Sequence, residues 1–264
     1  MVDSAVDRIL LRDRWIVGGC VVLITALAWV WLWREAQVMA PDESMPGMEM
    51  PGAGMISPSE TTAYLWSTFV MWLLMMVAMM LPSAAPMILF YSAIARSARV
   101  RGAALAPTSV FAAFYLAVWG AFSAVAALAQ WLLVRSGAIS DMTLAFGNQR
   151  IAGVLLIAAG VYQATPLKRT CLGACRSPMT FLMRFWRPGW KGAARLGLLH
   201  GLTCLGCCAA LMALLFVFGV MNLLWVAALA LVVLAEKTFP MGPRIAAAAG
   251  AVLGGVGFAL ALGA

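Results

Sequence analysis

The chain has 264 residues, of which 64% are hydrophobic and 11% are charged, and its formal net charge is +8. Soluble globular domains carry about 25% charged residues, so this composition excludes that class and predicts an all-α, polytopic membrane protein. The basic residues lie in short segments between apolar runs. That pattern is typical of membrane topology and contact with anionic lipid, and it excludes a nucleic-acid-binding surface. Because none of the six cysteines lies in a long polar loop, a secreted disulfide framework is excluded too.

Seven apolar runs predict a bundle of about seven membrane-spanning helices. They cover residues 15–33, 61–95, 107–134, 151–165, 196–220, 223–234 and 245–262. The segments that connect these runs would lie alternately on the two sides of the membrane. One set of segments has only Arg34, Arg135 and Arg150, and the other set has the remaining 15 of the 18 lysines and arginines. Because cytoplasmic segments are rich in Lys and Arg, the N-terminus is expected in the cytoplasm and the C-terminus outside.

The first span and the loop after it form an N-terminal part, residues 1–60, ahead of a six-span domain of residues 61–264. The loop is rich in proline and glycine and holds five methionines within residues 39–55. Thioether sulfur is a soft ligand that needs no deprotonation, so the loop is interpreted either as a collecting site for Cu(I) or as an ordinary linker.

The fifth span contains the single histidine of the chain together with three cysteines. Because an α-helix turns once in about 3.6 residues, positions i, i+4, i+7 and i+8 share one face. Imidazole and thiolate ligands suit Cu(I) or Zn(II), and thiolate-rich sites suit Cu(I) well. The alternative is a packing face, since cysteine also behaves as a small apolar residue. The candidate ligands in this stripe are His200, Cys204, Cys207 and Cys208.

Further sulfur ligands occur in the second span and in the basic segment before the fifth. Given the predicted topology, the second-span methionines and the fifth-span cysteines share a depth in the membrane, and we expect these two spans to be adjacent. A stripe of methionines is otherwise ordinary core packing. The supporting candidates are Met75, Met76, Met79 and Met80, and the pair Cys171 and Cys175 at C-x₃-C spacing.

Four motifs together resemble a bacterial family of predicted metal-binding integral membrane proteins, some of which are described as copper chaperones. The motifs cover residues 75–82, 166–178, 200–208 and 219–222, and the Glu236-Lys237 pair also fits. The resemblance extends over most of residues 60–245. It implies metal binding, a copper context and a place in the bacterial plasma (inner) membrane. The first span and the methionine-rich loop lie outside it, and Ala209 stands where the family suggests tryptophan.

The leading hypothesis is a Cu(I)-binding membrane protein that holds copper, translocates it or delivers it to a partner cuproenzyme or copper carrier. Zinc is the alternative metal. A membrane thiol–disulfide oxidoreductase is a second hypothesis, based on the C-x-x-C spacing of Cys204 and Cys207. A structural subunit of a larger complex or oligomer is a third, with Gly201 and Gly254 on docking faces. No nucleotide motif or catalytic triad is visible, which favours a binding role over an enzymatic one.

Glu236 has two interpretations. As an ionisable residue near the end of a span, it either snorkels to the membrane interface or pairs with Lys237, or else it faces a cavity that serves ions or protons.

Overall fold

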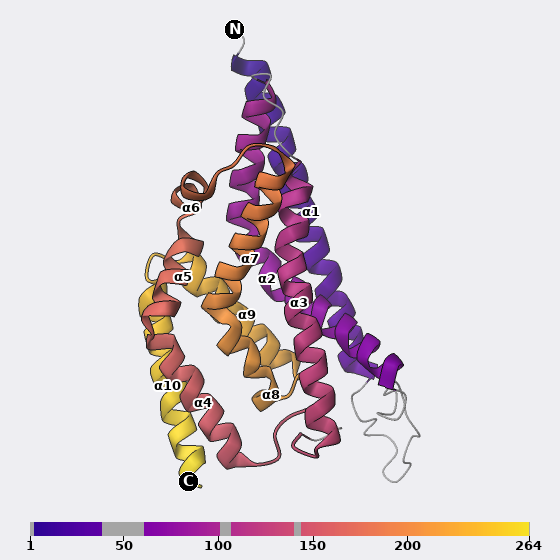
Figure 1. Ribbon diagram of the computed structural model, residues 1–264, viewed down its shortest axis with the longest axis vertical. Helices are drawn as coiled ribbons and strands as arrows, with labels where there is room; N and C mark the ends of the chain where they lie inside the picture. Colours follow the sequence, from indigo (N-terminus) through magenta and orange to yellow (C-terminus); the bar gives the residue numbers. More distant parts are fainter. Residues whose placement is uncertain (1–2, 39–60, 101–106, 140–143, 264) are drawn as a thin grey trace.

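A computed structural model describes residues 3–38, 61–100, 107–139 and 144–263, so the methionine-rich loop predicted to collect copper lies outside the described residues. The described chain is helical apart from its turns and one isolated bridge between Ile139 and Phe146. This confirms the predicted all-α class. The helices, shown in Figure 1, are α1 Asp3–Val38, α2 Thr61–Val100, α3 Thr108–Arg135, α4 Gln149–Ala164, α5 Pro166–Arg176, α6 Pro178–Phe185, α7 Gly189–Ala213, α8 Leu215–Phe218, α9 Leu223–Thr238 and α10 Gly242–Leu262.

Five of the described helices are long and apolar enough to cross a membrane, namely α1, α2, α3, α7 continued by α8, and α10. The pair α4 and α5 makes a sixth if its two helices, which meet at 61°, form one span. Each of the seven predicted runs is helical, but α9 has 16 residues, fewer than the about 20 that a perpendicular crossing needs. Seven spans and the orientation of the N-terminus therefore stay predictions.

The helices form two packed groups with α9 between them. In Figure 1, α1, α2, α3 and α7 lie together, and α4 and α10 run side by side along the opposite edge. Helix α9 contacts α2 on one side and α10 on the other. The contact between α4 and α10 is close because glycines face each other: a Cβ on Gly153 would lie 2.6 Å from the carbonyl oxygen of Gly257. Small residues let helix backbones approach in this way.

Helix α2 supplies much of the core. It continues through Pro82 and Pro86, the two positions at which the sequence predicts a bend because proline lacks an amide donor. The hydroxyl groups of Ser83 and Tyr115 donate to the carbonyl oxygen of Met80 at 2.9 and 3.2 Å. The interior of α2 is thus tied to α3 by a side-chain hydrogen bond next to the first proline.

The basic segment before α7 is more ordered than a connecting loop. It folds into the short helices α5 and α6, and each begins at a proline in its first turn, preceded by Thr165 or Ser177. The side chain of Thr165 accepts a hydrogen bond from the amide of Lys168, an ordinary N-cap. Lys168 itself is 1% exposed, so its side chain lies in the interior of the protein.

Candidate metal-binding site

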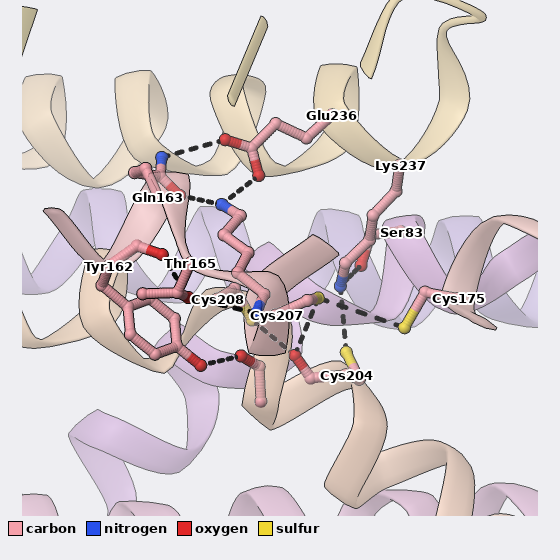
Figure 2. Close-up of polar contacts among 12 residues, drawn as sticks. Ser83, Tyr162, Gln163, Thr165, Cys175, Cys204, Cys207, Cys208, Glu236 and Lys237 are labelled. Atoms are coloured by element: carbon pink, nitrogen blue, oxygen red, sulfur yellow. Dashed lines mark hydrogen bonds and ion pairs between the residues drawn. The ribbon is translucent and has the colours of Figure 1, made fainter. Parts of the chain in front are cut away.

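A single turn of α7 presents three buried thiols. Cys204, Cys207 and Cys208 are each 1% exposed. The thiols of Cys207 and Cys208 both donate to the carbonyl oxygen of Cys204 at 3.0 Å. These bonds lie within the helix and orient the Cys207 and Cys208 thiols, which Figure 2 shows together with Cys204.

Cys207 faces α5. Its sulfur lies 4.0 Å from that of Cys175, well beyond the about 2.05 Å of a disulfide bond. Two thiolates that share one metal ion, with bonds of about 2.3 Å each as in zinc sites, lie at most about 4.6 Å apart. The sequence pairs Cys175 with Cys171, whereas the structure places its sulfur against α7. Cys171 packs beside it over Gly206, where an added Cβ would lie 2.9 Å from the Cys171 sulfur.

Cys208 faces α2, and its sulfur lies 3.7 Å from the thioether sulfur of Met80. This contact confirms the expected adjacency of the second and fifth spans at the depth of their sulfur atoms. Met75 and Met76 are also buried in the same helix. Met79 lines an apolar crevice of about 340 Å³ between α1, α2 and α9, which its neighbours Trp29 and Leu231 also line. Met80 is thus a candidate methionine whose sulfur lies against that of a cysteine.

Cys204 faces α3 and α9. The amino group of Lys237 donates to its sulfur at 2.9 Å, and the hydroxyl of Tyr115 lies 3.2 Å from it. Lys237 also donates to the hydroxyl of Ser83 at 3.1 Å. A lysine and a tyrosine therefore contact the thiol that lies one turn from the histidine, and a serine binds the lysine (Figure 2 shows Lys237, Ser83 and Cys204).

His200 lies one helical turn before Cys204 and is 3% exposed. The rings of Phe111, Tyr115 and Phe181 surround it at centroid distances of 5.9, 5.5 and 5.5 Å. Its Nδ1 atom is buried and has no hydrogen-bond partner among the residues that the structure describes. Buried polar atoms are normally paired, so this nitrogen is available to a ligand. Tyr115 contacts both the imidazole and the Cys204 sulfur and so connects the two ends of the stripe.

The predicted ligands gather in pairs rather than in one closed shell. Within the described ranges, no three His, Cys, Asp or Glu side chains are close enough to hold one metal ion. The close sulfur contacts are Cys207 with Cys175 and Cys208 with Met80. The arrangement offers soft two-coordinate positions, which Cu(I) accepts more readily than Zn(II), because structural zinc sites are almost always tetrahedral.

A buried ion pair between α5 and α9 lies next to the sulfur cluster. Lys168 on α5 and Glu236 on α9 approach to 2.6 Å, and both side chains are 1% exposed. Gln163 at the end of α4 donates to Glu236 at 3.1 Å and accepts a hydrogen bond from Lys168. Glu236 therefore pairs with Lys168, and Figure 2 shows it bonded to Gln163 and not to Lys237, the partner that one interpretation of the sequence gave it.

The polar residues around the sulfurs were absent from the predicted site. For Glu236 and Lys237 a signal existed, since ionisable residues in apolar segments are rare and commonly face an interior site. Tyr115, Ser83 and Lys168 carry no comparable signal, because each is an ordinary residue for its segment and only the packing of helices distant in sequence brings it to the cluster.

The fold and the site together define a class: an all-helical protein with several span-length apolar helices around a buried cluster of soft sulfur ligands. Residues 69–260 match the family PpoB2, described as a copper chaperone, and the chain belongs to this family. The match begins within α2, so α1 and the loop after it lie outside the matched residues. No curated protein and no solved structure matches the chain.

Proposed function

We propose that this protein is an integral membrane protein that binds Cu(I) through the cysteines of α7 and passes the ion across the bilayer or to a partner cuproenzyme. The observation that carries the proposal is the contact between Cys208 and Met80, 3.7 Å apart in the apolar interior of two span-length helices. A thiol and a thioether form a soft ligand pair suited to Cu(I). The family description, a copper chaperone, supports the same metal.

The proposed orientation is that of the sequence: seven spans in a bacterial inner membrane, with the N-terminus in the cytoplasm. In that orientation the α2 methionines lie on the path from outside, and Cys175 lies on the cytoplasmic side of the α7 cysteines. Copper would move between neighbouring sulfur atoms from Met80 through Cys208 to the Cys207 and Cys175 pair. Two-coordinate positions are suited to such transfer, because an incoming ligand can bind before the outgoing one leaves.

The test is the copper content of protein purified in detergent without oxygen and loaded with Cu(I). Wild-type protein should retain about one copper ion or more per chain after removal of weakly bound metal, as expected of soft thiolate ligands. A Cys204→Ser/Cys208→Ser variant should lose it. The matched control is Cys20→Ser, because Cys20 is exposed on α1 and outside the matched region. Full retention of copper by the double variant would refute the assigned site.

A second candidate function, a membrane thiol–disulfide oxidoreductase, is favoured by the 4.0 Å separation of the Cys175 and Cys207 sulfurs. A small shift of α5 would allow the two thiols to form a disulfide, with two electrons and two protons passing to a disulfide of a partner protein. Thiol labelling of membranes under oxidising and reducing conditions separates the two functions. A reversible redox-dependent loss of labelling at both positions supports the oxidoreductase, and labelling blocked only by Cu(I) supports the copper site.

A further inference from the structure

Lys237 is a buried amine with a sulfur atom as its close neighbour. It is 8% exposed, and its hydrogen-bond partners among the described residues are the Cys204 sulfur at 2.9 Å and the Ser83 hydroxyl at 3.1 Å. The adjacent carboxylate, Glu236, is already paired with Lys168 of α5. The carboxylate next to Lys237 in sequence therefore does not neutralise it.

A buried ammonium group is costly unless an opposite charge lies beside it. The hydroxyl of Ser83 supplies a hydrogen bond but no charge. The Cys204 sulfur, as a thiolate, supplies both, so the ammonium–thiolate pair has a net charge of zero. The structure thus places a fixed positive charge next to a candidate metal ligand. Metal coordination by itself does not require such a charge.

We propose, on the basis of the copper-binding function above, that Lys237 makes the site selective for monovalent metal ions. Cu⁺ binds the Cys204 thiolate and one further thiol, that of Cys208, which lies one helical turn away on the same face of α7. The second thiol releases its proton, so one positive charge enters and one leaves. The product is a bis-thiolate complex of charge −1, which the Lys237 ammonium neutralises.

A divalent ion breaks this balance. Zn²⁺ or Cd²⁺ on the same two thiolates gives a neutral complex, and the Lys237 charge then stands uncompensated in an apolar interior. A third thiolate would restore neutrality, but in the part of the chain that the structure describes no three such ligands converge. The selectivity of the site thus arises from charge, in addition to the softness of its sulfur ligands.

The experiment measures the competition between Cu(I) and Cd(II) for purified protein under anaerobic conditions. Cd(II) is soft but divalent, so it separates charge from softness. Lys237→Gln keeps an N–H donor toward Cys204 and Ser83 and removes the charge, whereas Lys237→Arg keeps the charge. Ser83→Ala, which removes the other partner of Lys237 and leaves its charge in place, is the matched structural control.

We expect Lys237→Gln to lower the ratio of bound Cu(I) to bound Cd(II) on the order of 1,000-fold, the scale of one unit charge about 4 Å from another at an effective dielectric constant of about 20. Lys237→Arg and Ser83→Ala should keep the wild-type ratio. An unchanged ratio in Lys237→Gln, or an equal fall in Lys237→Arg, would overturn the selectivity role and leave the copper site standing.

Two further outcomes complete the test. If wild-type protein binds Cd(II) as tightly as Cu(I), the charge argument fails whether or not the variants fold. If wild-type protein binds no Cu(I), the proposed function fails and the selectivity role fails with it. Metal bound per chain is measured directly by elemental analysis, so the readout does not depend on any transport or delivery activity.

Discussion

Breaking the ion pair between Lys168 and Glu236 should strongly destabilise the fold. Both groups are 1% exposed and 2.6 Å apart, so neither can turn to solvent when its partner is removed. In the Lys168→Met variant, Glu236 keeps only the hydrogen bond from Gln163 at 3.1 Å. Removing one partner of a buried ion pair typically costs about 3–5 kcal/mol because it leaves an uncompensated charge.

Removing both charges has a different expected result. In Lys168→Met/Glu236→Met no buried charge is left unpaired, and apolar replacement of a whole buried pair is often neutral. We therefore expect the double variant to recover most of the stability that Lys168→Met loses. Gln163 then loses both of its partners, so recovery should fall short of the wild type by about 1–3 kcal/mol, the cost of unsatisfied buried polar atoms.

The assay is equilibrium unfolding in mixed detergent micelles, followed by circular dichroism, for the wild type, both single variants and the double variant. The measured quantity is the coupling free energy between Lys168 and Glu236, which follows from the unfolding free energies of the four proteins. A loss below about 1 kcal/mol in Lys168→Met, the usual value of an exposed pair, would refute the reasoning. So would a double variant whose loss equals the sum of the two single losses.

Two other predictions test the surroundings of the site. Mild oxidation of membranes should join Cys175 to Cys207 in a disulfide, because their sulfurs are 4.0 Å apart. Mass spectrometry of peptides would identify this disulfide, which should be absent in Cys175→Ser. A disulfide between Cys207 and a different cysteine would contradict the packing of α5. Trp72→Phe should lower the unfolding free energy by about 1–3 kcal/mol, because the indole of this fully buried residue donates to Gln130 at 2.8 Å. Trp66→Phe, at a position that is 67% exposed, is its control, and equal losses in the two variants would count against the hydrogen bond.

The sequence predicts the helices well because their signal is local. Long apolar runs without charge leave the chain few alternatives to a helix in an apolar medium, and each predicted run corresponds to a helix. The short helix α5 is not predicted because it lies in a basic segment, and for α6 the sequence indicates only an interfacial helix over residues 181–190, where aromatic and basic side chains occur together. Their starting signals, Thr165-Pro166 and Ser177-Pro178, are present in the sequence and would have placed both N-termini.

The site was predictable only in part. Helical spacing places Cys204 and Cys208 on a common face from residue numbers alone, and soft-ligand chemistry selects Met80 as a candidate. The pairings could not be predicted, because they depend on which helices become neighbours. Cys175 meets Cys207 instead of Cys171, and Lys237 meets Cys204, through contacts between residues more than thirty positions apart.

The most direct test of copper binding by the α7 cysteines is X-ray absorption at the copper edge on protein loaded with Cu(I) without oxygen. The structure predicts a shell of sulfur atoms near the about 2.3 Å of metal–thiolate bonds, with at most one nitrogen from His200, and loss of this shell in Cys204→Ser/Cys208→Ser. A shell of nitrogen and oxygen atoms alone, or an identical spectrum in the double variant, would contradict the assignment of copper to these cysteines.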